Sequence, residues 1–292
     1  MVIGVLLLVL STSAFAEEAN FSGLHFHVEQ DLFAPLGLDG DQSYTMGVGI
    51  QATGKWFRNV GYPQHLVDQL LTDAIPSIRL TPESDEEAFH SFMIVGSAFT
   101  PHNVREEEPV KGDRPYASLL GLITSRTWVD KADRLDERHA ITTELGVGLL
   151  GLDVARYIQT RIHESIRGAH KPSGWHNQVS QGGELTGFYR VGLRRRLTPY
   201  VDNGVKCFDA SVDADIWLGY YTNASLGTTV RLGSFYSPFY DFTSMPIGMA
   251  NKASQFSSSQ VMGEFFVFGA VRGRGVLYNA LLQGAAKEFD AT

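Results

Sequence analysis

Strict alternation of apolar and polar residues runs through most of this chain and limits the folds open to it. Leu24, Phe26 and Val28, for example, alternate with His25 and His27. Nine stretches show this period of two, near 24–29, 43–51, 90–100, 114–127, 138–149, 183–197, 205–217, 222–233 and 262–279. Because successive side chains of a strand point to opposite faces, each stretch predicts a strand with one apolar and one polar face.

Such strands suit two kinds of protein. In a soluble sandwich the apolar faces pack inward, whereas in an outer-membrane barrel they meet lipid and the polar faces line the lumen. Aromatic residues near the strand ends favour the barrel, because they can form its interfacial girdles: Tyr220, Tyr221, Phe235, Tyr236, Phe239 and Tyr240. We therefore expect an all-β, antiparallel transmembrane β-barrel.

The N-terminal segment has the pattern of a secretory signal. Residues 1–16 carry no charge, contain an apolar run over 2–10 and end in Ala14-Phe15-Ala16, a small-x-small cleavage site, although they lack the basic region that usually comes first. We predict a signal peptide over 1–16 and a single barrel domain over 17–292. The alternative is an ordinary buried N-terminal segment. No later stretch approaches eighteen consecutive apolar residues, which excludes a helical-bundle membrane protein.

Two stretches break the alternation with a helical period. Residues 61–75 carry leucines at helical spacing between two prolines, and 152–167 carry Val154, Ile158 and Ile162 four residues apart beside a polar face with Gln159 and His163. The segment 235–260, rich in Ser, Pro, Gly and aromatic residues, is expected to be a long loop.

Composition excludes several function classes. The chain has 24 Lys and Arg against 32 Asp and Glu, a formal net charge of -8, and no basic run. This balance argues against nucleic-acid binding. Cys207 is the single cysteine, so an intrachain disulfide framework and a cysteine-rich zinc site are both excluded.

Several polar residues are candidates for chemistry. Asp31 and Thr45 flank one predicted loop, and a carboxylate at a strand end is a reasonable site for a hard cation such as Ca²⁺. The alternative is a turn aspartate and a polar strand threonine. His163 has the residue type expected of a general base that activates water, although a lone surface histidine usually has no such role. Lys111 and Arg114 could hold a phosphate or form a salt bridge at the rim.

Four short blocks occur in an order that points to one family. They are Glu29-Gln30-Asp31-Leu32-Phe33; Asp41-Gln42-Ser43-Tyr44-Thr45-Met46-Gly47; Gly112-Asp113-Arg114-Pro115-Tyr116-Ala117; and Gln159-x-x-x-His163 followed by Gly174-Trp175-x-x-Gln178. With these blocks, over about residues 20–280, the sequence resembles the outer-membrane lipid A 3′-O-deacylases (LpxR-like proteins).

The resemblance implies a fold and an activity. It implies a twelve-stranded barrel, of which this chain is expected to lack the last strands, with a site between the barrel wall and the loop helix near 152–167. It also implies a carboxylic ester hydrolase of the bacterial outer membrane that uses Ca²⁺. The substrate would be lipid A of lipopolysaccharide, from which the 3′-linked acyloxyacyl chain is released.

The resemblance also implies roles for individual residues. Asp31 would bind Ca²⁺, His163 would activate the attacking water, and Thr45 matches a Ser/Thr position of the family. Gln159 would orient the histidine or the substrate. Arg105, Lys111 and Arg114 are candidates to bind a lipid A phosphate.

The sequence also departs from the family pattern. Gln30 stands where the family has Asn before the Asp, which lengthens the side chain by one methylene, and the acidic residue expected after the helix appears as Ala169 or His170. A site built for Asn can lose its geometry with Gln. Two alternatives therefore stay open: an inactive barrel with a structural or binding role, and a broader phospholipase.

Overall fold

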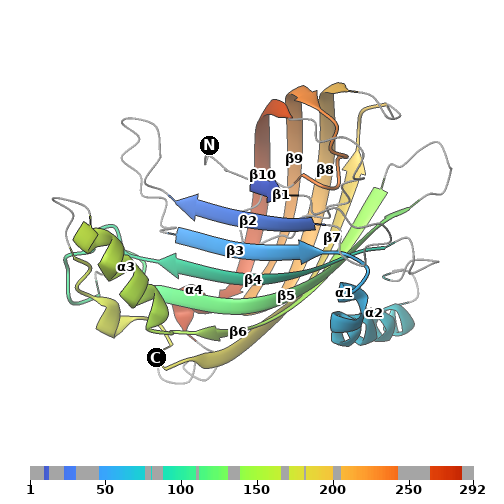
Figure 1. Ribbon diagram of the computed structural model, residues 1–292. Coiled ribbons are helices and arrows are strands. Elements are labelled where there is room, and N and C mark those ends of the chain that lie inside the picture. The colour runs from blue at the N-terminus through green and yellow to red at the C-terminus, as the bar shows by residue number, and fades with distance from the viewer. Residues whose placement is uncertain are drawn as a thin grey trace.

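The protein forms one antiparallel sheet in which every strand pairs with the next along the chain (Figure 1). The computed structural model describes residues 10–12, 23–30, 46–75, 80, 88–109, 112–130, 139–165, 171–180, 182–199, 205–242 and 264–284. The strands are β1 (Leu10–Thr12), β2 (Gly23–Gln30), β3 (Met46–Thr53), β4 (Phe89–Phe99), β5 (Ala117–Asp130), β6 (His139–Leu150), β7 (Glu184–Arg196), β8 (Lys206–Gly219), β9 (Tyr221–Phe235) and β10 (Phe265–Asn279).

The helices lie at the two ends of the strands. They are α1 (Phe57–Val60), α2 (Tyr62–Ala74), α3 (Val154–Ser165), a 3₁₀ turn (Trp175–Asn177) and α4 (Ala280–Gln283). In Figure 1, α3 covers one end of the sheet, and α1 and α2 lie at the opposite end. Of the helices in the described part of the chain, none has the length and apolar character needed to cross a membrane.

The structure confirms the nine predicted strands and both predicted helices. It adds the short strand β1, which lies inside the predicted signal segment and pairs with β2 through Leu10↔Phe26. Cleavage after Ala16 stays a prediction. The predicted loop over 235–260 is irregular at 236–242, and its remainder lies outside the described residues.

The sheet curls into an open half-barrel. β1 and β10 are its end strands, and no pairing joins β10 to β1 or β2 in the described ranges. From β4 to β10 the strands contain 11 to 15 residues. A tilted strand needs about 9 to 11 residues to cross a bilayer, so these strands are long enough to span one.

The outer face of the sheet is apolar and exposed. Its side chains belong to one parity of each strand and include Phe26, Val28, Val48, Ile50, Ile94, Leu120, Leu122, Val147, Leu149, Leu185, Leu193, Ile216, Leu218, Leu226, Leu232, Val267 and Val271. A soluble domain rarely exposes such a large contiguous apolar surface. This face has the character of the lipid-facing band of a membrane barrel.

The inner face is buried and divided between an apolar cluster, which includes Met93, Val95, Leu119, Ile123, Phe188 and Trp217, and a network of charged side chains. Arg190 lies 3.0 Å from Glu144 and also pairs with Asp215, while Arg272 bridges Asp215 at 2.8 Å. Asp209 pairs in the same way with its neighbour Arg231. These ion pairs show that the polar parity of the strands points inward, as the barrel prediction requires and a sandwich does not.

Candidate functional site

Helix α3 docks on the outer face of the wall where the strands end. Ala155 of α3 forms a buried cluster with Ala98 of β4, Tyr116 and Trp175. Ala98 has the same parity as the exposed Ile94, so this cluster lies on the outer side of the sheet. The helix therefore faces the barrel wall at a level where the lipid-facing surface ends.

Trp175 fixes the helix to the wall. Its indole Nε1 donates a hydrogen bond of 2.7 Å to Oε1 of Gln159, and its ring lies 4.8 Å from the ring of Tyr116. Gly174 makes room for this contact, because a Cβ at that position would lie 2.6 Å from Cε2 of Tyr116. Residues of the third and fourth sequence blocks thus meet in one packing unit.

Backbone contacts join the two loops beside α3. The Tyr116 hydroxyl donates to the carbonyl of Val104 at 2.9 Å, and the Ser173 amide donates to the same carbonyl at 2.9 Å. Burial raises the pKa of Tyr116, so this hydroxyl stays a donor well beyond neutral pH. Asn177 adds a bond from Nδ2 to the carbonyl of Glu107.

Gln178 ties the ends of the loop that carries α3. Its Oε1 accepts from the hydroxyl of Ser118 in β5 at 3.1 Å, and its Nε2 donates to the carbonyl of Gly151 at 3.2 Å. A buried amide satisfied at both ends stabilises one loop conformation. The Gly174-Trp175-x-x-Gln178 block therefore acts as a brace that holds α3 in place.

Helix α3 exposes apolar side chains and buries a polar one, which is the reverse of an ordinary surface helix. Ala155 and Gln159 are buried and His163 is half-buried, whereas the apolar Val154 and Ile158 are exposed. His163 thus belongs to the same stripe as the two side chains that contact the wall, one turn beyond Gln159. His163, the predicted base, therefore faces the protein.

At the end of α3, Glu164 is held by two cations. It pairs with Lys171 at 2.7 Å and with Arg161 at 3.4 Å. The hydrogen bond and charge of Lys171 lower the pKa of the Glu164 carboxyl.

Asp31 and Thr45 lie outside the described residues, but the register beside them is described. The β2–β3 ladder ends at Gln30↔Met46, and Met46 pairs in turn with Ala98 of β4. Gln30 in β2 therefore lies two strands, about 10 Å, from the strand on which α3 docks, and Met46 in β3 lies one strand from it. Ala155 and His163 are about 12 Å apart along the helix axis, which is a comparable span.

Arg114 and Arg105, two of the residues predicted to bind a lipid A phosphate, have different surroundings. The guanidinium of Arg114 lies 5.1 Å from the ring centre of Phe99, and Arg105 is exposed on the 100–109 loop. Lys111 lies outside the described residues. Their proposed contact with a lipid A phosphate stays a prediction.

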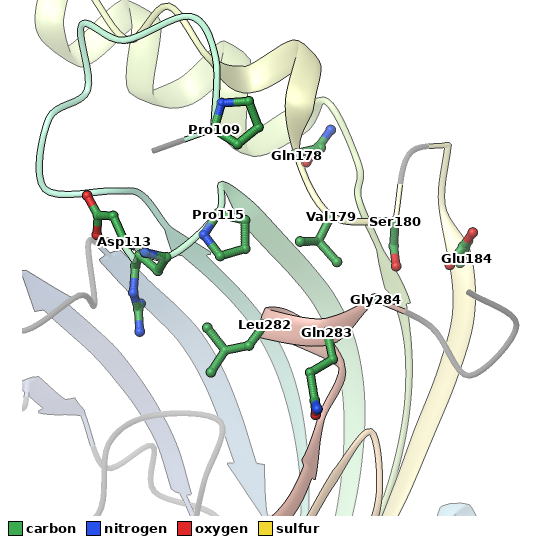
Figure 2. Close-up of a pocket in the computed structure, with 11 residues that line it drawn as sticks. Pro109, Asp113, Pro115, Gln178, Val179, Ser180, Glu184, Leu282, Gln283 and Gly284 are labelled. Atoms are coloured by element: carbon green, nitrogen blue, oxygen red, sulfur yellow. Dashed lines mark hydrogen bonds between the residues drawn. The ribbon is translucent and has the colours of Figure 1, made fainter. Parts of the chain in front are cut away.

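A cleft of about 600 Å³ lies beside this unit (Figure 2). It is lined by Pro109, Asp113, Arg114, Pro115, Gln178, Val179, Ser180, Glu184, Leu282, Gln283 and Gly284. Figure 2 shows Leu282 and Gln283 on one side and Pro109 and Gln178 on the other. The cleft therefore combines the third and fourth blocks with α4, and His163 is not among these lining residues.

No cluster of three or more metal-ligating side chains occurs in the part of the chain that the structure describes. The Ca²⁺ site predicted at Asp31 therefore stays a prediction. The sequence predicted no role for Ser118, which anchors the α3 loop through Gln178, and it gave Tyr116 only as a member of the third block. The one signal for Ser118 was its place at the start of the predicted strand that follows Gly112.

Comparison with known proteins agrees with this architecture. A family model described as outer membrane protein LpxR matches residues 1–292. The chain belongs to the LpxR family. LpxR from Salmonella typhimurium has a similar solved structure, with a TM-score of 0.56 and 21% sequence identity, over 83% of this chain and 69% of that one. No curated protein sequence matches the chain.

LpxR membership places the chain in the outer membrane and confirms the family resemblance of the four blocks. The solved LpxR structure supports the fold, since its similarity extends over most of the strands. The exposed apolar face of the half-barrel is accordingly the surface that meets the lipid of the outer membrane.

Proposed function

We propose that this protein is a Ca²⁺-dependent ester hydrolase that removes the 3′-linked acyloxyacyl chain of lipid A. The observation that carries the proposal is the docking of α3, which turns the Ala155–Gln159–His163 stripe toward the barrel wall. An enzyme that acts on a lipid must present its base where the lipid-facing surface meets water. The docking of α3 at the strand ends of an LpxR-family sheet satisfies this requirement.

In the proposed reaction each residue has a separate task. His163 takes a proton from the attacking water, and the hydroxide adds to the ester carbonyl. The tetrahedral intermediate then breaks its bond to the 3′-oxygen of the sugar, which receives the proton from His163 and leaves as the alcohol, while the acyloxyacyl chain leaves as the carboxylic acid. Gln159 keeps the helix in register through its bond to Trp175, so it acts as a positioning residue. Thr45 is proposed to hydrogen-bond the substrate beside Asp31, and Arg105, Lys111 and Arg114 to contact a lipid A phosphate.

The residues around Asp31 suit a hard cation chemically. The Asp31 carboxylate, the Thr45 hydroxyl and the Gln30 amide all offer oxygen donors, which Ca²⁺ prefers. A bound Ca²⁺ would supply electrophilic stabilisation of the oxyanion that forms on the ester carbonyl. The same set offers no soft ligand for a transition metal.

The test is a mass spectrum of lipid A after incubation with refolded protein, in Ca²⁺ and in chelator. Folding is first verified by circular dichroism and by heat-modifiable gel mobility. We expect a Ca²⁺-dependent mass loss of one acyloxyacyl group. His163→Ala should lower the rate by about 10²- to 10⁴-fold, the usual contribution of a general base.

His102→Ala is the matched control, because His102 is exposed on the neighbouring loop and outside the stripe of α3. It should leave the rate unchanged. Folded protein that releases no acyl chain would overturn the deacylase proposal in favour of an inactive barrel. Release of acyl chains from glycerophospholipids in the same assay would favour a broader phospholipase.

A further inference from the structure

Helix α2 packs against the lipid-facing side of the barrel wall. Asp68 of α2 is buried against Arg126 of β5 in an ion pair. In the β5–β6 register Leu122 faces Val147 and Arg126 faces Thr143, so Arg126 has the same parity as two exposed apolar side chains. The helix therefore lies outside the barrel and not in its lumen.

The contact between α2 and the wall is polar. Asp68 accepts a hydrogen bond from the hydroxyl of Tyr189 at 2.6 Å and from that of Thr143 at 3.0 Å. Gln64, one turn earlier, donates to the carbonyl of Thr143 at 2.7 Å. Asp68 and Arg126 expose 0% and 3% of their side chains, so α2 covers a charge that would otherwise face lipid.

The remaining surface of α2 is divided into two flanks. Pro63 and Leu70 lie on one flank of the exposed surface and Gln69 lies on the other, whereas Leu66 and Asp73, seven residues apart, lie together between the two flanks. Leu66 and Leu70 expose 43% and 68% of their surface. A helix with its polar contacts on the wall, one apolar flank and one polar flank suits the boundary between lipid and water.

Two exposed aromatic residues lie at the same end of the strands as α2. Trp56, just before α1, and Tyr62, the first residue of α2, are exposed by 58% and 60%. Phe57 of α1 stacks on Phe92 of β4 at 6.2 Å between ring centres, so α1 also lies on the outer face. Exposed Trp and Tyr gather at membrane interfaces because their rings are amphipathic.

The depth of Arg126 along β5 agrees with a position of α2 at the membrane interface. Arg126 lies four residues before Asp130, the last residue of β5, which is about 13 Å along the strand. Strand tilt reduces this to about 10 Å in depth, the level at which interfacial helices bury their apolar flank.

We propose that α1 and α2 form a membrane-interface anchor, which buries Leu70 and Trp56 among the lipids of the leaflet opposite α3. The flank with Gln69 faces water, and Leu66 and Asp73 lie at the boundary between lipid and water. The anchor fixes the height and tilt of the barrel in the bilayer and covers Arg126.

The test compares two adjacent residues on opposite flanks. In a Cys207→Ser background, Leu70→Cys and Gln69→Cys are labelled with a nitroxide in vesicles of defined phospholipid. Accessibility to oxygen and to a water-soluble nickel chelate is measured by electron paramagnetic resonance. Leu122→Cys on the outer face of β5 serves as the lipid reference and Lys171→Cys as the water reference.

We expect the oxygen-to-nickel ratio at position 70 to approach that at 122 and to exceed the ratio at 69 several-fold. A label at 70 that is as accessible to nickel as the label at 171 would overturn the proposal. So would a label at 70 shielded from both reagents, because a protein partner or a second copy would then cover the flank.

A second measurement avoids labelled variants. Phospholipid brominated near the headgroup should quench the fluorescence of the intact chain more than that of Trp56→Phe. Equal quenching of the two proteins would contradict the anchor, since Trp56 would then lie away from lipid. Heat-modifiable mobility of each variant shows beforehand that the barrel is folded.

Discussion

Trp175 and Gln159 are joined by a hydrogen bond from the indole Nε1 to the side-chain carbonyl, 2.7 Å long and buried between α3 and the wall. The bond connects the 3₁₀ turn after α3 to the stripe that carries His163. Loss of this bond therefore loosens the helix and leaves the barrel intact.

Trp175→Phe tests this relationship. The substitution keeps an aromatic ring beside Tyr116 but leaves the Gln159 carbonyl without its donor, at a cost of about 1–3 kcal/mol. If α3 opens locally, trypsin should cut at the exposed Arg156 and Arg161 about tenfold faster for each 1.4 kcal/mol lost. Tyr157→Phe, on the exposed side of α3, is the control. An unchanged cleavage rate in Trp175→Phe would contradict the role of the bond.

Gly174→Ala should also displace α3. The added methyl group would lie 2.6 Å from Cε2 of Tyr116 and 2.8 Å from the Glu106 carbonyl oxygen. Overpacking of this kind costs about 1–3 kcal/mol. Gly269→Ala on β10 has no heavy atom within 4 Å of the added carbon and should be neutral. The measurement is the midpoint of thermal conversion in heat-modifiability gels, and equal midpoints for both variants would count against the close packing.

Asp215→Asn should destabilise the sheet itself. Its two oxygens hold Arg190 and Arg272 on the inner face, and the carboxylate is 1% exposed. Removal of one partner from a buried charge network costs about 3–5 kcal/mol, because Arg190 and Arg272 then share only Glu144 and Asp213 as counter-charges among the described residues. Urea unfolding in detergent, followed by circular dichroism, measures the loss.

Glu164→Gln is the matched control for Asp215→Asn. This substitution also removes a carboxylate, but its partners Arg161 and Lys171 are largely exposed. Exposed ion pairs contribute little, so we expect no measurable change in unfolding. A destabilisation as large as that of Asp215→Asn would show that the inner network has no special role.

Gln30→Asn tests the departure from the family pattern. In the proposed site, the shorter amide restores the residue that the family has before the aspartate, at a position that pairs with Met46. We expect lipid A deacylation to increase by about tenfold, which corresponds to about 1.4 kcal/mol of transition-state stabilisation. A decrease would indicate that this chain is adapted to the longer side chain.

The alternation of the strands predicted nine strands and the two faces of the sheet, because period two over eight or more residues indicates a strand. It did not distinguish a barrel from a sandwich, which the signal segment and the aromatic residues at the strand ends decided. The blocks around Asp31, Tyr116 and His163 indicated the family, which the comparison then confirmed. Local periodicity also placed α2 and α3 along the chain.

Only the tertiary structure decided which face of each helix meets the protein. An apolar stripe normally packs inward, but in α2 Asp68 contacts the wall and in α3 Gln159 contacts Trp175, whereas Leu66, Leu70 and Ile158 are exposed. The physical reason is the membrane. The outer face of this sheet borders lipid, so a helix docked there is stabilised by hydrogen bonds that are buried on the side facing the protein. Neither Arg126 nor Trp175 carries a local pattern that reveals its distant partner.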